Sequence, residues 1–345
     1  MTRQIHVGPV AVGGGAPVSI QSMLNTKTTD VEGSLAQIRA LAAAGADIVR
    51  LAVPTMAAAR AFADIASASP LPLVADIHFD YRLAVAAAEG GAAKIRINPG
   101  NIGAPDRVRA VVEACGARGI PIRIGVNGGS LEPALLEKYG RPTAEALVES
   151  AMGHVRILEE YGFTDICVSM KSSGVPVTVE AYRLFHERSD YPLHLGVTET
   201  GTAYMGTVKS AVGIGSLLLQ GIGDTLRVSL TADPVEEIRA GKAILRACGL
   251  RKDGVEVIAC PTCGRTKIDL IGLARQVEAA LADCRKELTV AVMGCVVNGP
   301  GEAREADVGI AGGDGCGVLF VRGEKRETVP YDQLLPRLLA YIDAL

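Results

Sequence analysis

The sequence has no tryptophan, and aromatic residues make up only 4% of its 345 residues. It also has no block of lysine and arginine residues, and its formal net charge is -3 at pH 7. Nucleic-acid-binding proteins usually carry a basic face, often with aromatic residues for stacking, so these absences argue against a nucleic-acid partner. The lysine and arginine residues that are present are therefore expected to act at local sites, not as one basic surface.

Long apolar segments are missing as well. No stretch approaches the ~20 uninterrupted apolar residues that a membrane-spanning helix needs, and residues 1–8 lack the pattern of a signal peptide. We therefore expect a cytoplasmic protein with no membrane partner. In that compartment the eight cysteines are not expected to form disulfides, so clustered cysteines become candidate metal ligands. The isolated Cys115, Cys167 and Cys248 are expected to be buried small hydrophobes.

Two common cofactor motifs are also absent. The sequence has no C-x3-C-x2-C run of the kind that radical S-adenosylmethionine enzymes need, and no G-x-G-x-x-G stands between a strand and a helix. Gly213 and Gly215 lie within an apolar helical segment and match that second motif only weakly. Electrons for any redox reaction must therefore come from outside the chain.

What is present is a regular alternation of short β-branched runs with alanine-rich helical stretches, through about residue 245. Eight strands are predicted, at Val18–Met23, Ile48–Val53, Leu73–Ile77, Lys94–Ile97, Ile122–Val126, Ile166–Met170, Leu193–Val197 and Thr225–Leu230. Eight successive βα units with buried strands favour a TIM (β/α)8 barrel within the α/β class. A doubly wound open sheet is the alternative.

A second domain is expected after the barrel, because the chain exceeds the ~250 residues typical of one barrel. Asp233–Glu237 opens the last barrel helix with a cap, a first-turn proline and early acidic residues. Residues 249–254 are then polar and glycine-punctuated, so we expect residues 1–248 to form the barrel and 254–345 a small α/β domain. Its predicted strands are Val255–Ala259, Leu288–Met293, Val308–Ala311 and Gly317–Val321, and its predicted helices are Ile268–Leu281 and Tyr331–Leu345.

Five cations lie within or at the ends of the predicted barrel strands: Arg50, Arg96, Arg123, Lys171 and Arg227. Barrel active sites lie where strands end and the following loops begin. One such cation alone could form an ion pair with a neighbouring residue. Five that converge on one mouth repel each other unless an anion such as phosphate or diphosphate neutralises them. The pattern therefore predicts a phosphorylated substrate.

Other polar residues share these positions, among them Asn127 and Ser229. Glu199 is a candidate proton donor, because a carboxyl group in a closed pocket can have its pKa raised towards neutrality; it could equally be a salt-bridge partner for the cations. Asp76 and His78 are two residues apart, so on a strand their side chains share a face. They could orient one ligand or each other.

The second domain carries three cysteines in a suggestive pattern, Cys260-Pro-Thr-Cys263 and Cys295. The Cys-x-x-Cys pair alone fits zinc, a redox pair or an iron–sulfur cluster, and no histidine follows residue 194 to complete a zinc site within this domain. Three thiolates can hold a cluster and leave one iron with a replaceable ligand, where substrate can bind. Cys284 and Cys316 remain possible fourth thiols of a closed four-thiolate site.

The turns around these cysteines suit a cluster loop, because Pro261 and the Gly-Pro-Gly run at 299–301 let backbone amides approach sulfur. The second turn leads to Glu302. A carboxylate is a weaker ligand for a cluster iron than thiolate, so Glu302 could hold the fourth position and yield it to substrate. It could also be a solvated residue at the start of the following segment.

These residues resemble the family of 4-hydroxy-3-methylbut-2-enyl-diphosphate synthases of the non-mevalonate isoprenoid pathway. The resemblance covers nearly the whole chain, and the last of its seven motifs is very specific. The motifs are Ser19–Met23, Ala75–Tyr81, Arg96–Ile102, Ile122–Leu131, Gly221–Leu230, Ala259–Cys263 and Gly294–Glu302.

The resemblance implies a 4Fe-4S cluster held by three cysteines and one glutamate, which fall on Cys260, Cys263, Cys295 and Glu302. It also implies an oxidoreductase that opens 2-C-methyl-D-erythritol 2,4-cyclodiphosphate with two electrons and loss of water, at the iron with the replaceable ligand. Reduced flavodoxin or ferredoxin is the implied electron donor.

The same resemblance assigns further roles. Glu199 matches the family's proton-donating acid, and Asn298 matches a residue that reaches substrate from the cluster domain. The implied diphosphate-binding residues are Arg50, His78, Arg96, Arg123, Asn127, Lys171, Arg227 and Ser229. The family is homodimeric, with the site shared between subunits. Segment Gly201–Thr207 departs from the family's pattern, which leaves loop closure there unassigned.

Two other functions fit the same residues. A dehydratase could use the cluster iron only as a Lewis acid on a phosphorylated substrate, and its rate would not respond to a reductant. A cluster carrier or a zinc-stabilised binding protein would show no catalysis at all.

Overall fold

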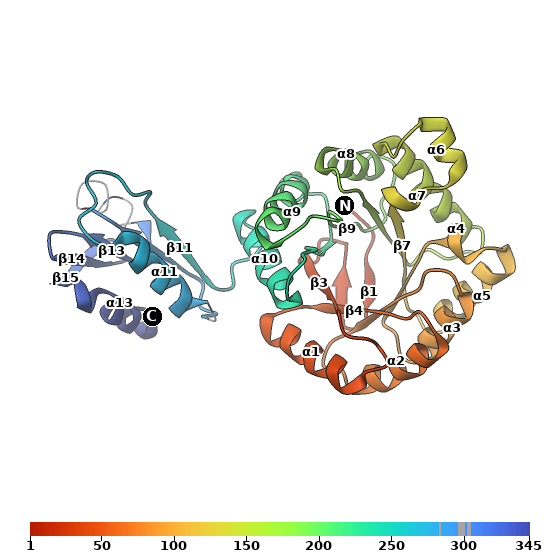
Figure 1. Ribbon diagram of the computed structural model, residues 1–345, viewed down its shortest axis with the longest axis horizontal. Coiled ribbons are helices and arrows are strands. Elements are labelled where there is room, and N and C mark those ends of the chain that lie inside the picture. Colours follow the sequence, from red (N-terminus) through yellow and green to blue (C-terminus); the bar gives the residue numbers. More distant parts are fainter. Residues whose placement is uncertain (283, 296–300, 302–304) are drawn as a thin grey trace. The chain divides into compact units, whose positions relative to one another are not determined.

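The computed structural model describes residues 1–282, 284–295, 301 and 305–345. The chain divides into two compact units, Met1–Arg251 and Lys252–Leu345 (Figure 1). In the described part of the chain, no helix is long and apolar enough to cross a membrane.

The first unit is built on an eight-stranded sheet in the order β8-β7-β6-β5-β4-β3-β10-β9. Its strands are parallel, and an isolated parallel bridge between Val168 and Leu193 joins the two ends of this order, so the sheet forms a ring. The TIM-barrel prediction is confirmed. The strands are β3 (Ser19–Met23), β4 (Ile48–Ala52), β5 (Leu73–Asp76), β6 (Lys94–Ile97), β7 (Ile122–Asn127), β8 (Ile166–Lys171), β9 (His194–Leu195) and β10 (Thr225–Leu226).

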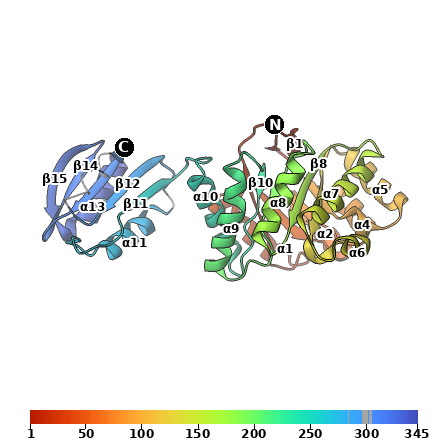
Figure 2. The same ribbon diagram turned by 90° about the horizontal axis from the view of Figure 1, so that it is seen from above.

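Helices surround this ring (Figure 1), and neighbouring helices such as α8 and α9 lie side by side (Figure 2). As the sequence predicts, the α10 cap is formed by Asp233, whose side chain accepts a hydrogen bond from the Val235 amide. The helices are α1 (Val31–Ala44), α2 (Met56–Ala68), α3 (Tyr81–Glu89), α4 (Pro99–Ile102), α5 (Pro105–Gly116), α6 (Pro133–Tyr139), α7 (Ala144–Glu159), α8 (Val175–His186), α9 (Ala203–Leu218) and α10 (Pro234–Ala247).

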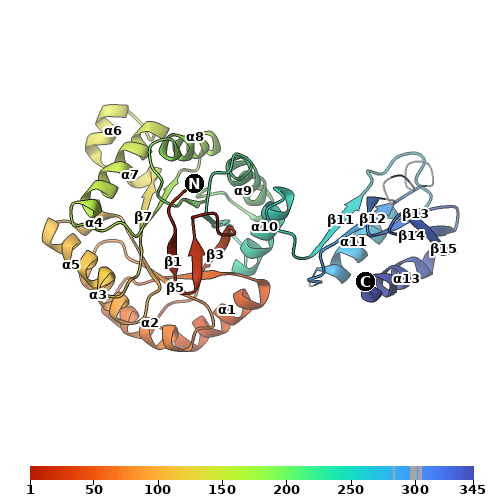
Figure 3. The same cartoon turned by 180° about the vertical axis from the view of Figure 1, so that it is seen from behind.

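An amino-terminal hairpin that the sequence analysis did not predict closes one end of the barrel. Its strands, β1 (Ile5–Val7) and β2 (Val10–Val12), pair in antiparallel fashion, and Figure 3 shows β1 across the ring of strands. Ile5, Val7 and Val12 pack with Ile48, Val74 and Cys167 in one small apolar cluster. Since Ile48 begins β4 and Cys167 lies near the start of β8, the hairpin covers the amino ends of the strands.

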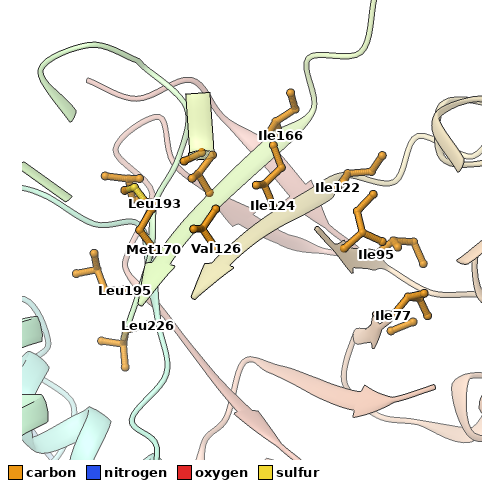
Figure 4. Packing of buried hydrophobic residues seen from close by; sticks show 14 of the residues in the cluster. Ile77, Ile95, Ile122, Ile124, Val126, Ile166, Met170, Leu193, Leu195 and Leu226 are labelled. Atoms are coloured by element: carbon orange, nitrogen blue, oxygen red, sulfur yellow. The ribbon is translucent and has the colours of Figure 1, made fainter. Parts of the chain in front are cut away.

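Alternate residues of each strand have different surroundings. Ile95, Ile124 and Val126 belong to the large apolar cluster that joins the strands to the helices (Figure 4). Residues between them in the sequence, such as Arg96 and Arg123, face the inside of the barrel, because side chains alternate along a strand. This alternation turns the charged side chains inward.

The second unit contains a five-stranded sheet in the order β11-β12-β13-β14-β15. Strands β11 (Val255–Ala259), β12 (Leu288–Met293) and β13 (Val308–Gly312) are parallel, and β14 (Cys316–Val321) and β15 (Glu324–Pro330) continue it antiparallel. Helices α11 (Leu270–Leu281) and α13 (Leu334–Ala344) pack on it, and Val277, Leu319 and Leu338 lie in their shared core. The sequence analysis missed β15, because its polar residues carry no apolar signal.

Candidate functional site

A small cavity of about 140 Å³ lies at the carboxyl ends of the barrel strands. It brings together all eight barrel residues that the sequence analysis named for diphosphate binding. They are Arg50, His78, Arg96, Arg123, Asn127, Lys171, Arg227 and Ser229, and Asp76, Ser169 and Thr198 complete the lining. We call this cavity the anion pocket. Its five cations come from five different strands or strand ends, so only closure of the barrel places them together.

Asp76 neutralises part of this charge. Its carboxylate lies 3.0 Å from Arg96 Nη1, 3.7 Å from Arg50 Nε and 3.7 Å from His78 Nε2. Burial alone would raise the pKa of Asp76, but the charges of Arg50 and Arg96 together outweigh burial and hold the pKa at about 2. Asp76 is therefore an anion at any ordinary pH, and it orients both neighbouring cations and His78.

Glu237, in the first turn of α10, neutralises a second part of the positive charge of the anion pocket. Its carboxylate accepts two hydrogen bonds from Arg227, from Nε at 3.1 Å and from Nη2 at 3.0 Å. The Ser22 hydroxyl and the Leu230 amide also donate to it, at 2.9 and 3.2 Å. The sequence analysis treated Glu237 only as an acidic residue at a helix start, and no local pattern distinguishes it from its exposed or half-buried neighbours.

Arg123 and Lys171 have no carboxylate partner among the residues that the structure describes. The Nε and Nη1 atoms of Arg123 are buried and have no hydrogen-bond partner. Burial, reinforced by Arg96, lowers the pKa of Arg123 to about 10, and burial followed by the charge of Arg123 lowers that of Lys171 well below its usual value. Five cations face only two carboxylates, so the pocket has room for about three negative charges.

Two glycines and a methionine shape the pocket, and the sequence analysis named none of them. Arg96 lies across Gly125 and donates to its carbonyl oxygen at 3.1 Å, and a side chain at Gly125 would collide with the guanidinium. At Gly196, a Cβ atom would lie 2.6 Å from Lys171 Nζ. The Met23 sulfur accepts from Arg50 Nη2 at 2.9 Å, which orients the guanidinium without neutralising it.

Glu199 lies beside the anion pocket. It lines a neighbouring cavity of about 460 Å³, which shares Asn127 and Thr198 with the anion pocket. Its backbone has a φ of +54°, a left-handed conformation that costs a non-glycine residue on the order of 1 kcal/mol. The Thr200 hydroxyl donates to the Ser229 carbonyl and so ties this loop to the pocket. Glu199 itself is exposed, so a closed environment for its carboxyl group requires a further element.

The three predicted cluster cysteines lie at one edge of the second sheet. Cys260 directly follows β11 and Cys295 comes shortly after β12, and these strands are parallel neighbours that pair Ala259 with Val292. The Gly294 amide donates to Cys260 Sγ at 3.3 Å. Amide hydrogen bonds of this kind stabilise a thiolate ligand. Cys263 is exposed, and its amide donates to Thr266 Oγ1 at 3.2 Å.

The two other thiols of this unit lie at opposite edges of the sheet. Cys316 begins β14 next to the carboxyl end of β13, on the side of Cys260, and its carbonyl accepts from the Gly313 amide at 2.7 Å. Cys284 follows α11 and precedes β12, which places it at the other edge. Glu302 and Asn298 lie outside the described residues. Within residues 1–282, 284–295, 301 and 305–345, no three potential metal ligands are gathered closely enough to hold an ion.

Comparisons with protein families match nearly the whole chain. Residues 2–242 match the GcpE TIM-barrel domain, and residues 256–344 match the GcpE protein C-terminal domain. A relative from Geobacter sulfurreducens is 61% identical over 100% of this chain and 98% of its own length. Another relative, from Clostridium perfringens, is 59% identical over 100% of this chain and 99% of its own length. Both are named 4-hydroxy-3-methylbut-2-en-1-yl diphosphate synthase (flavodoxin).

Solved structures share the barrel fold at low identity. Dihydropteroate synthase from Yersinia pestis superposes with a TM-score of 0.51 at 13% identity, over 72% of this chain and 100% of that one. 3-dehydroquinate dehydratase from Geobacillus kaustophilus superposes with a TM-score of 0.50 at 15% identity, over 72% of this chain and 99% of that one. At such identity the likeness extends to the fold alone.

Proposed function

The chain belongs to the GcpE family, and from that premise we propose that it converts 2-C-methyl-D-erythritol 2,4-cyclodiphosphate to 4-hydroxy-3-methylbut-2-enyl diphosphate. It is an oxidoreductase of the non-mevalonate isoprenoid pathway, with flavodoxin as the donor in its relatives' name. The observation that carries the proposal is the anion pocket, in which five cations face two carboxylates.

The charge of the pocket suits this reaction. Each phosphate of the cyclic substrate has two ester or anhydride links and so carries one negative charge. Opening the ring breaks one carbon–oxygen bond, and the freed phosphate oxygen adds a third charge to the diphosphate. Cations that already surround that oxygen stabilise the charge as it develops. Arg123 and Lys171, which have no carboxylate partner among the described residues, are the cations available to it.

For the electrons, we propose a 4Fe-4S cluster held by Cys260, Cys263, Cys295 and Glu302. The thiol donor set and the amide hydrogen bond to Cys260 Sγ support this assignment. When bound, the cluster supplies the two electrons, which reduced flavodoxin or ferredoxin delivers to it. We place the reaction in the cytoplasm, where thiols stay reduced.

The same proposal assigns roles to the remaining groups. The eight barrel residues of the anion pocket bind the diphosphate, and Asn298 contacts substrate from the second unit. Glu199 donates the proton that converts the departing hydroxyl to water. The net change is two electrons and one proton consumed per substrate dianion, with a trianion and water formed.

We further propose a homodimer in which the site is shared between subunits. Support comes from exposed apolar side chains near the barrel mouth. Phe79 follows β5 and is 72% exposed, and Tyr204, in the first turn of α9, is 77% exposed. Met205, Val208 and Val212 are further exposed apolar residues of α9. Exposed apolar side chains that gather on one helix are typical of an interface.

Reductant dependence is the direct test of the proposed function. Protein purified without oxygen is expected to be brown, to contain about four irons per chain, and to consume the cyclodiphosphate only with a reduced donor. A rate that does not change with reductant would favour the dehydratase. A colourless, folded, zinc-loaded protein would rule out both redox and Lewis-acid iron chemistry.

Replacing Glu199 with glutamine removes the proposed proton donor and keeps the size of the side chain. We expect kcat to fall by about 10²–10⁴, the usual contribution of general acid catalysis, with little change in the Kd for the cyclodiphosphate. Stopped assays and equilibrium binding measure the two quantities. Glu160→Gln, an exposed residue at the end of α7, serves as the matched control. Full turnover by Glu199→Gln would show that another group donates the proton.

A further inference from the structure

The barrel interior beneath the anion pocket is unusually polar. Barrels usually fill this space with layers of branched apolar side chains. Here five fully or nearly fully buried residues turn polar groups into it, and none of those groups has a hydrogen-bond partner among the described residues. They are Ser19, Gln21, Lys94, His194 and Thr225.

Strand register places this cluster below the pocket. Lys94 begins β6 and lies two residues before Arg96, so both side chains face the interior and Lys94 is the deeper. Thr225 pairs with Ser19 on one side and with His194 on the other, also at strand starts. Lys94 is fully buried, which is rare for an unpaired lysine.

Most of the charged residues that face the barrel interior are cations. The titratable or charged residues of the strands that face the interior are Arg50 on β4, Asp76 on β5, Arg96 on β6, Arg123 on β7, Cys167 and Lys171 on β8, His194 on β9 and Arg227 after β10. Strand β3 and the hairpin contribute no charge there. Asp76 is the one carboxylate in this set, and it is already engaged by Arg50 and Arg96.

A further buried acidic residue lies before β10 and is engaged elsewhere. Asp224, just before β10, accepts hydrogen bonds from the Thr2 hydroxyl at 2.6 Å and the Leu193 amide at 2.8 Å. Burial lowers the pKa of Lys94 from 10.5 to about 8, and the charges of Arg123 and Arg50 contribute in the same direction. In the ligand-free protein Lys94 therefore loses its charge as the pH rises through 8.

We propose that Lys94 is a positioning residue of the anion pocket, which takes up a proton when the diphosphate binds and then adds its charge to that of Arg123 at the ligand. This inference rests on the proposed function. The proton comes from solvent and goes to Lys94 Nζ, and no other bond changes. Burial is the main reason that a charged Lys94 is unfavourable, and repulsion from Arg123 and Arg50 adds to it. A dianion above Arg123 offsets that repulsion, so binding and protonation favour each other.

Calorimetric titration of the full chain with the cyclodiphosphate tests the coupling. Without a reductant the ligand binds and does not turn over, and its phosphates do not titrate above neutral pH. Measurements in two buffers of different ionisation enthalpy give the number of protons taken up per ligand. The contribution of Lys94 is the difference between the native protein and Lys94→Met.

The difference cannot exceed about 0.1 proton at pH 7, about 0.5 at pH 8 and about 0.9 at pH 9, the values for a full return of the pKa to 10.5. Because Lys94 stays buried, we expect a smaller uptake that grows from pH 7 to pH 9. Lys171 also gains a proton on binding, but Lys94 is not among the main causes of its lowered pKa, so the subtraction isolates Lys94. Gln21→Met alters the same buried cluster without removing a titratable group, and it should keep the full uptake.

The possible results of the titration test the role of Lys94 and the proposed function separately. Equal uptake by the native protein and Lys94→Met would overturn the role of Lys94 and leave the proposed function standing. No binding of the cyclodiphosphate at all would overturn the proposed function, and this inference with it. If Lys94→Met does not fold, an NMR titration of the native protein, with its lysines labelled with ¹³C at Cε, tests the inference instead. Lys94 and Lys171 should both titrate below the usual lysine range, and the low-titrating resonance that remains in Lys171→Met is that of Lys94. It should shift to higher pH when the ligand binds the native protein; a Lys94 resonance that does not shift would overturn the inference.

Discussion

Replacing Arg123 with methionine is expected to weaken substrate binding strongly and, at the same time, to raise the stability of the barrel. Arg123 is buried with two donor atoms unpartnered, so methionine removes an uncompensated cation from the interior. Removing such a charge is expected to stabilise the ligand-free fold by about 1–3 kcal/mol. The same change removes charge-assisted hydrogen bonds to the diphosphate, which lowers kcat/KM by about 10³, or about 4 kcal/mol.

Arg227→Met is the matched comparison, because Arg227 lines the same pocket but has a buried partner. Its loss leaves the Glu237 carboxylate, which is only 3% exposed, without its cation. We expect destabilisation by about 3 kcal/mol together with a similar loss of binding. The two variants should thus agree in activity and differ in the sign of the stability change.

Thermal unfolding of ligand-free protein and steady-state kinetics measure these effects. For a barrel of this size, the Arg123→Met stabilisation corresponds to a rise in Tm of several degrees, about 2–4 °C per kcal/mol. A lower Tm for Arg123→Met would show that its guanidinium is satisfied within the folded barrel, contrary to its geometry. A substrate affinity that does not change would remove Arg123 from the binding site.

Loss of one cluster cysteine is the second change expected to have a large effect. Cys260→Ala removes the thiolate that accepts the Gly294 amide, and we expect iron content to fall from about four per chain to near zero, with turnover reduced by at least about 10³. Far-UV circular dichroism should change little, because Cys260 lies after β11 and is only partly buried at the margin of the apolar clusters of the unit.

Two cysteines of the same unit provide controls. Cys284→Ala, at the opposite edge of the sheet, should retain its iron. Cys316→Ala distinguishes the candidates for the fourth ligand, since Cys316 lies on the cluster side. It should also retain iron and activity if Glu302 holds that position. If Cys316→Ala loses its iron while Cys284→Ala keeps it, the site instead has four thiolates, with Cys316 as the fourth. Iron analysis and the visible absorption of anaerobic protein measure both outcomes.

Much of the anion pocket could be predicted from the sequence, because strand alternation is local and eight successive βα units indicate a closed barrel. Lys94–Ile97 places charged and apolar residues on alternate faces, and the apolar face must pack against helices. Arg96 is then turned inward. The same alternation in the other strands turns Arg50, Arg123, Lys171 and Arg227 inward, towards one mouth of the barrel.

The pairing of those cations could not be predicted in this way. The sequence places Asp76 at a strand end beside His78 without indicating its arginine partners, and it gives Glu237 no sign of a role beyond a helix start. Each carboxylate neutralises a particular arginine, which leaves Arg123 and Lys171 without a carboxylate partner among the described residues. Contacts such as that between Met23 and Arg227 join residues far apart in the chain. The exposure of Glu199 likewise depends on how its loop folds against Ser229.

The sequence by itself determined the barrel, the cations at its mouth, the three cysteines and, through its motifs, the family. Each of these follows from local periodicity or from the residue types that a given chemistry needs. Only the tertiary structure decided which charges are paired, which stay buried without a partner, and that Lys94 lies beneath them. Burial and pairing depend on distances between strands, and the closed ring of the barrel sets those distances.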